Sequence, residues 1–360
     1  MHFAEPTQGN EDTKMATNTI QRLMQQAPAT HDVAWLQSAL QAAIQLELAT
    51  LPPYLSAMFS IADQTSAPFT LINDIVFNEM THFGLACNLL AATGGQPTIV
   101  AGYRKTVYPG PLPGGVKPKC DNSFFPCDPD FEVVLGFMDL KSFAKMAMQI
   151  EYPEDPVPLH AALALGETFP SIGEFYKAVE DAFTSNTAQL PYTTTKQLTK
   201  PRMDITLVDN LANAVKAIEL IRGEGEGSSK NPFFNGKLSH FYAFGELFHG
   251  ATYVFDPATQ TGDWTGTAIP AVTIAPMTPI PLGGYPNPPA PAVAALSTCD
   301  QNFTDMLTEL DAAWATGSTA SLGAAIGSMS DLGDSARTLL GLAIARTDAP
   351  GIYGPQFRLK

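Results

Sequence analysis

Several acidic residues and histidines occupy helix positions that would otherwise be apolar. Glu79 and His82 form Glu-x-x-His within INDIVFNEMTHFGLACNLL, and Glu47 lies within AAIQLELATLPPYLSAM. Residues three or four apart share one face of a helix, and at that spacing these three residues have alanine, leucine and isoleucine neighbours. A buried carboxylate needs a proton, a partner or a metal ion, because leaving it uncompensated is costly. We therefore predict that these side chains meet around a metal in a helical core.

The Glu-x-x-His spacing is typical of a dinuclear site. In carboxylate bundles, one glutamate from each of two helices joins Glu-x-x-His motifs from the other two. Oxygen ligands combined with imidazole suit iron or manganese, whereas structural zinc sites favour thiolate. The alternative is a purely structural role, in which the carboxylates form salt bridges or share protons. No arginine or lysine lies at helical spacing beside Glu47 or Glu79, which disfavours that alternative.

The second half of the predicted site is less regular. Glu151 ends KSFAKMAMQIEYPE beside a proline, and Glu226 and His240 flank a glycine-rich break. We hypothesise that the third and fourth helices of the bundle are each interrupted at the metal. Insertions at 152–170 and 227–236 would then loop out and return. Breaks beside a site leave room for a substrate.

Other residues compete for this second half. Glu174 is a candidate ligand, although a capping box with Ser171 already explains it. Glu246 and His249 also form Glu-x-x-His, but they lie off the helix face that His240 marks. Two further glutamates are expected to face solvent: Glu219 and Glu224.

The elements that must position these residues are mainly helices. Apolar periodicity, caps and breakers predict helices over 31–60, 68–93, 131–151, 171–183, 205–222 and 237–252, and one or two more within 303–345. Pro52 and Pro53 predict a kink or break in the first helix. Three glycines make helix beyond residue 222 doubtful. We find no strand pairs and no internal repeat, so the predicted fold class is mainly α.

Long proline- and glycine-rich segments accompany the helices. The loop from Gly102 to Pro126 carries Tyr103, Tyr108, Phe124 and Phe125, which either roof an aromatic pocket or pack on the surface. The predicted division is a flexible lead over 1–30, a metal-binding helical bundle over 31–255, a proline-rich wrapping segment over 256–297 and a small C-terminal helical extension over 298–360.

Composition excludes several classes of function. The 360 residues are 45% hydrophobic and carry a net charge of -15, which disfavours binding to nucleic acid or to anionic membranes. No apolar run is long enough to span a membrane, and the first residues do not form a secretory signal, so a cytoplasmic location is expected. Cys120 and Cys127 flank a loop; two reduced thiols are favoured over a disulfide there.

Several segments resemble a known family. They are AIQLELATLPPYLSAMFSI, NEMTHFGLACNLLAATGG, YPGPLPGGVKP, IEYPE, SIGEFYKAVEDAF, GEGEG with SHFYAFGEL, and YGPQFR. Together, mainly over residues 33–250, they resemble the ferritin-like domain of iminophenyl-pyruvate dimer synthases. The resemblance implies a ferritin-like helical bundle that holds two iron ions, or iron and manganese. It places six residues at the metal: Glu47, Glu79, His82, Glu151, Glu226 and His240.

The same resemblance suggests a function. Those synthases couple two imines derived from an aromatic amino acid in violacein and related bisindole pathways, but they are much longer chains. We therefore expect a stand-alone oxidoreductase that uses O2 or peroxide on a small, amino-acid-derived substrate such as an aromatic imine. The alternatives are metal storage without turnover and peroxide disproportionation at a dimanganese site. A homo-oligomer is compatible with each of these functions.

Overall fold

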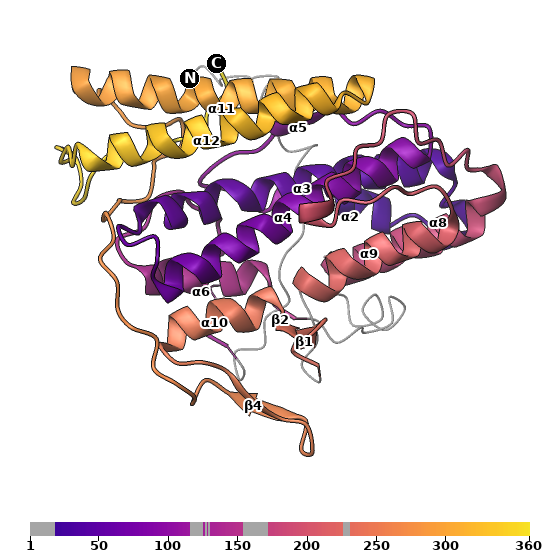
Figure 1. Cartoon of the computed structure of the whole chain (residues 1–360), viewed down its shortest axis with the longest axis horizontal. Helices are drawn as coiled ribbons and strands as arrows, with labels where there is room; N and C mark the ends of the chain where they lie inside the picture. Colours follow the sequence, from indigo (N-terminus) through magenta and orange to yellow (C-terminus); the bar gives the residue numbers. More distant parts are fainter. Residues whose placement is uncertain (1–18, 116–124, 127, 129, 154–171, 226–230) are drawn as a thin grey trace, which may run out of the picture.

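Two long helices that follow each other in the chain form the centre of the molecule (Figure 1). They are α3 (Val33–Ser60) and α4 (Ala67–Ala92), and they pack against each other. Asp32 and Ser66 begin them by accepting a backbone N–H three residues later, which satisfies donors that a helix start leaves free. These bounds agree with the first two predicted helices.

Pro52 and Pro53 lie inside α3, yet the helix continues through them to Ser60. Because Pro53 has no N–H, it cannot donate to the carbonyl of Ala49 one turn earlier. The hydroxyl of Tyr108 donates to that carbonyl instead, at 2.6 Å. A side chain from another segment thus satisfies the exposed backbone group, and the break that the two prolines suggested does not occur.

Four shorter helices complete a bundle around this pair. α6 (Leu140–Ile150) packs against α10 (His240–His249), and α8 (Ile172–Asn186) packs against α9 (Leu211–Gly225). α6 and α8 both contact α3, whereas α9 and α10 both contact α4. In Figure 1 the α6–α10 pair and the α8–α9 pair lie along different parts of the central helices. The third and fourth helices of the bundle are therefore each split in two, as hypothesised.

The third helix begins later than the predicted range of 131–151 suggests, at Leu140. Gly136 has φ of +84°, which a right-handed helix does not allow. The neighbouring backbone is extended and pairs with the proline-rich segment, where the N–H of Met277 donates to the carbonyl of Phe137 at 2.8 Å. A partner far along the chain thus replaces the first turns of the predicted helix.

The predicted range of 205–222 differs from α9 at both ends. The helix begins only at Leu211, because residues before it are held in extended pairing. It then continues through Gly223 to Gly225. A Cβ at Gly223 would lie 2.1 Å from the ring of Phe234, so the glycine permits this ring to pack directly on the helix. Tertiary packing therefore extends the helix past the point where its glycines predicted an end.

The expectation of no strand pairs is wrong, because the described residues include two short antiparallel hairpins. They are formed by β1 (Phe233–Phe234) with β2 (Lys237–Leu238) and by β3 (Val254–Asp256) with β4 (Thr261–Asp263). Asn235 and Gly236 join the first pair with φ of +49° and +80°, as a type I′ turn requires. The Asn-Gly pair in FFNGKL is a hairpin signal in the sequence.

Two long C-terminal helices, α11 (Ala290–Thr316) and α12 (Thr319–Gly341), form an antiparallel pair beside the bundle (Figure 1). They are longer than the small extension that the sequence predicts. Asp311 accepts the backbone N–H of Ile99, at the start of α5 (Ile99–Tyr103), at 2.7 Å. The indole N–H of Trp314 donates to Asn88 of α4 at 3.0 Å. The first contact attaches the pair to α5, and the second attaches it to α4, the helix that carries the Glu-x-x-His motif.

The computed structural model describes residues 19–115, 125–126, 128, 130–153, 172–225 and 231–360. Its remaining elements are α2 (Thr19–Met24) and the 3-10 turns Pro28–Thr30, Pro113–Gly115, Thr187–Gln189 and Pro201–Met203. α2 buries Ile20 against the core, so this part of the predicted lead is packed. Cys120, Cys127, Ser171 and most of the insertion at 152–170 lie outside the described residues. No described helix is long and apolar enough to cross a membrane.

Candidate metal centre

Three glutamates and two histidines converge between the two halves of the bundle. One ligating atom from each of Glu47, Glu79 and His82 lies within 4.8 Å of the others, and the same holds for Glu79, Glu151 and His240. All five residues are buried. Glu79 belongs to both groups, so its carboxylate lies between two clusters of ligands. In carboxylate bundles, a glutamate shared in this way could contribute to the binding of two ions.

His82 presents its two ring nitrogens to different partners. Nδ1 lies 3.7 Å from Oε2 of Glu47 and 3.9 Å from Oε1 of Glu79. Nε2 lies 3.1 Å from Oε2 of Glu224, on α9. A carboxylate on one nitrogen of a ligating histidine orients the ring and makes the other nitrogen a better ligand. This arrangement leaves Nδ1 as the nitrogen available to a metal.

His240 begins α10 and faces the other cluster. Its Nδ1 lies 2.9 Å from Oε1 of Glu79 and 3.7 Å from Oε2 of Glu151. Neither ring nitrogen forms a hydrogen bond with suitable alignment, although both are buried. Buried polar atoms rarely lack a hydrogen-bond partner, so a ring nitrogen of His240 is suited to bind a metal ion. The break between α9 and α10 places His240 at the first turn, directly beside the carboxylates.

Three hydroxyl groups hold the carboxylates in place. Thr50 donates to Oε2 of Glu79 at 2.7 Å. Tyr54 donates to Oε1 of Glu151 at 2.5 Å, and Tyr176 of α8 donates to Oε1 of Glu47. In Glu79 and Glu151, the carboxylate oxygen that does not accept this hydrogen bond faces His240. Hydrogen bonds to ligating carboxylates fix their orientation in this way.

Burial and neighbouring charges shift the pKa values of Glu47, Glu79, His82 and His240. Burial and, after it, the nearby Glu79 carboxylate raise the pKa of Glu47 to about 8. Burial alone would raise the pKa of Glu79, but His240 and His82 outweigh burial and lower it. Burial alone would lower the pKa of each histidine, yet the surrounding carboxylates raise the pKa of His82 and raise that of His240 to about 10. The metal-free centre therefore holds protons that a metal ion must displace.

The donor set fits iron or manganese. It combines three carboxylates with two imidazoles, and no thiolate is among them. Within the described residues, no lysine or arginine forms an ion pair with these glutamates; Arg222 lines the same cavity but pairs with Glu180 at 3.3 Å. The cavity between the ligands has a volume of about 30 Å³, enough for a molecule the size of water.

Comparison with known families gives this geometry a context. Residues 40–249 match the ferritin-like family model. The chain belongs to the ferritin-like family. A crystal structure of a ferritin-like protein from Caulobacter vibrioides is similar, with 24% sequence identity and a TM-score of 0.60 over 90% of this chain and 97% of that chain. A likeness at this identity shows the fold alone. No curated protein matched the sequence.

In this ferritin-like chain, the structure brings together five of the six predicted ligands: Glu47, Glu79, His82, Glu151 and His240. Glu226 lies outside the described residues. Glu224, which we expected to face solvent, instead contacts His82, and its side chain is 22% exposed. Glu219 is exposed, as predicted.

In this ferritin-like bundle, the three residues that were alternatives for the second half of the predicted site have other contacts or positions. Glu246 accepts the backbone N–H of Tyr253 at 2.9 Å. His249 is exposed and stacks on Trp264, with ring centroids 4.4 Å apart. Glu174 lies in the first turn of α8 and is in neither group of ligating atoms. None of these three residues belongs to either group of ligating atoms among the described residues.

Sequence reasoning missed the residues that support the ligands. Thr50 lies three residues after Glu47, on the same helix face, so its spacing carried a signal. Tyr54 follows one turn later, and a buried tyrosine needs a partner for its hydroxyl. Tyr176 and Glu224 reach the centre from the ends of other helices, and only the tertiary structure reveals that proximity.

Proposed function

We propose that this chain is a non-haem dinuclear oxidoreductase that uses iron, or iron with manganese. It would act with O2 or peroxide on a small substrate derived from an amino acid. The observation that carries the proposal is that Glu79 belongs to both groups of ligating atoms. A shared carboxylate holds two ions close enough to act together.

Each ion of the proposed centre would have its own ligands as well as one shared ligand. Glu47 with His82 would hold one ion, Glu151 with His240 the other, and Glu79 both. Such a metal pair supplies the capacity to pass electrons between the substrate and the oxidant. Thr50, Tyr54 and Tyr176 keep the carboxylates oriented through their hydrogen bonds. Electrons and protons removed from the substrate leave with the oxidant, as hydrogen peroxide from O2 or as water from peroxide.

The choice of an amino-acid-derived substrate rests on the resemblance to iminophenyl-pyruvate dimer synthases. The family comparison supports the ferritin-like fold and leaves the substrate to this resemblance. An aromatic imine generated by an amino-acid oxidase is therefore the first substrate to screen.

Peroxide disproportionation at a dimanganese site is a second candidate, and one observation favours it. The cavity of about 30 Å³ between the ligands accommodates a molecule of the size of peroxide rather than an aromatic compound. Purified chain loaded with manganese would evolve oxygen from hydrogen peroxide if this candidate is correct.

Metal analysis tests the proposal most directly. We expect about two iron or manganese ions per wild-type chain, by analogy with carboxylate bundles. The variant Glu79→Ala with His82→Ala should lose them, whereas the matched Glu219→Ala should retain them, because Glu219 is exposed on α9. Oxygen-dependent consumption of the imine would separate an enzyme from a storage protein. A wild type that cannot be loaded with either metal would overturn the proposal.

A further inference from the structure

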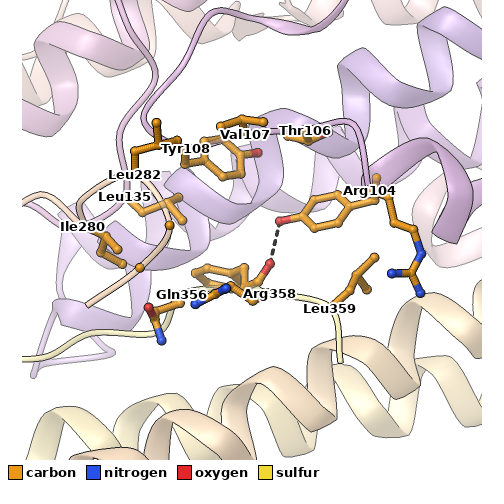
Figure 2. A pocket seen from close by; sticks show the side chains of 14 residues that line it. Arg104, Thr106, Val107, Tyr108, Leu135, Ile280, Leu282, Gln356, Arg358 and Leu359 are labelled. Atoms are coloured by element: carbon orange, nitrogen blue, oxygen red, sulfur yellow. Dashed lines mark hydrogen bonds between the residues drawn. The ribbon is translucent and has the colours of Figure 1, made fainter. Parts of the chain in front are cut away.

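A second cavity lies on the side of the molecule where the loop after α5 meets the C-terminal segment. Its volume is about 280 Å³, close to the lower range of ligand pockets. Figure 2 shows side chains from three segments facing one another across it: residues 103–108, 280–284 and 356–359. None of its lining residues lines the cavity at the metal centre. Every one of them is described by the structure.

The walls of this cavity combine apolar and polar side chains, and two of its aromatic rings are held in place. The hydroxyl of Tyr103 donates to the carbonyl of Phe357 at 2.9 Å, drawn as a dashed line in Figure 2. The hydroxyl of Tyr108 is bound to the carbonyl of Ala49. Because both phenol hydroxyls have partners in the protein, the rings offer only apolar surface to the cavity. Leu282 also lines it and is 69% exposed.

Arg358 supplies a positive charge at this apolar surface. A Cβ at Gly284 would lie 2.6 Å from Nη1 of Arg358, so the absence of a side chain there makes room for the guanidinium. Gly284 has φ of +91°, which favours glycine at this turn. Gln356 is fixed over the same turn because its Oε1 accepts the N–H of Tyr285 at 3.0 Å. The guanidinium is therefore seated in the lining of the cavity.

The guanidinium of Arg358 is exposed and forms no ion pair within the described part of the chain, although it interacts electrostatically with the Asp300 carboxylate. Asp300 accepts the backbone N–H of Arg358, at 3.1 Å, and forms no ion pair with its side chain. Arg104, a second lining residue, likewise has no ion pair there. Arg104 and Arg358 are both exposed, and together they place two positive charges at one cavity of a chain with 35 acidic and 20 basic residues. A guanidinium binds carboxylates through paired hydrogen bonds.

We propose that this cavity binds an aromatic carboxylate, with the acid group on Arg358 and the ring against Tyr108 and Leu282. The apolar part of the lining, which includes Tyr108 and Leu282, suits a ring, and the exposed guanidinium of Arg358 suits an anion. Arg104 adds positive potential at the rim. The site is separate from the metal centre and does not depend on the proposed oxidoreductase activity.

Calorimetric titration of the full chain with indole-3-propionate tests this site. We expect one molecule to bind per chain, and the neutral amide of the same compound to bind about tenfold more weakly or worse. Arg358→Gln should weaken binding of the acid by at least about tenfold, because it removes a charged hydrogen-bond donor. Arg202→Gln is the matched control: it removes an exposed arginine that does not line the cavity, and it should bind the acid like the wild type.

Two further variants keep the result unambiguous. Leu282→Asp places a negative charge at an exposed position, so it should weaken binding of the acid without affecting folding. The chain with Glu79→Ala and His82→Ala should bind the acid like the wild type, since those residues lie elsewhere. Binding that survives both Arg358→Gln and Leu282→Asp would overturn the proposal. Binding lost with the metal ligands, or no binding at millimolar acid, would also overturn it.

Discussion

Replacing Glu224 by alanine is expected to weaken metal binding by about 10- to 100-fold, or roughly 1.4 to 2.7 kcal/mol. The carboxylate lies 3.1 Å from Nε2 of His82, whose side chain is only 2% exposed. Without Glu224, water has little access to that nitrogen, and the ring is free to rotate or to change tautomer. Because Glu224 is partly exposed, its removal should leave the fold intact.

The assay is a competition between the protein and a chelator for iron(II) under anaerobic conditions. Glu224→Gln should have an intermediate effect, because the amide oxygen can still accept a hydrogen bond but carries no charge. Glu219→Ala removes an exposed glutamate from the same helix and should bind iron like the wild type. Melting temperatures of the three variants provide the check that each is folded.

One result would refute this reasoning. If Glu224→Ala binds iron as tightly as the wild type, the contact with His82 does not support the metal. If Glu226→Ala then loses the iron, the residue that the family resemblance favours is the ligand. Loss in both variants would instead fit a ligand at position 226 and an orienting carboxylate at position 224.

Three other outcomes are expected. Thr50→Val should lower the free energy of unfolding by about 1 to 3 kcal/mol in urea titrations, because Glu79 loses a hydrogen bond; an unchanged value would contradict this. The apparent metal affinity should rise from pH 6 to pH 9, since a pKa of about 10 keeps His240 protonated until a metal displaces the proton; an affinity independent of pH would contradict this. Asn88→Ala should lower the free energy of unfolding by about 3 kcal/mol or more, measured the same way, because Asn88 is buried with four hydrogen bonds. A loss below about 1 kcal/mol would contradict it.

The central helices and half of the centre could be predicted because their signals are local. Asp32 and Ser66 are caps that stand in the sequence next to the helices they begin. Glu79 and His82 share a face by spacing alone, and the apolar neighbours of Glu47 predict its burial. All three are buried and converge in the structure.

The features that were missed depend on partners far away in the chain. Gly136 and its neighbours looked helical, but they pair with the backbone around Met277. Phe234 packs on Gly223 and extends α9, which brings Glu224 to His82. The helix and strand propensities of the neighbouring residues do not indicate either effect. The predicted domain division, cytoplasmic location and homo-oligomer stay predictions.

The hydrogen bonds of Asn88 have a consequence for how the molecule opens. Its Nδ2 donates to the carbonyls of Leu198 and Thr206, and its Oδ1 accepts from Trp314 of α11. If the C-terminal helices detached alone, Oδ1 of the buried Asn88, near the end of α4, would lose the indole N–H of Trp314. Partial opening is therefore disfavoured, and α11 should exchange its amide protons together with the helix that carries Glu79. The C-terminal pair then belongs to the same cooperative unfolding unit as the metal centre.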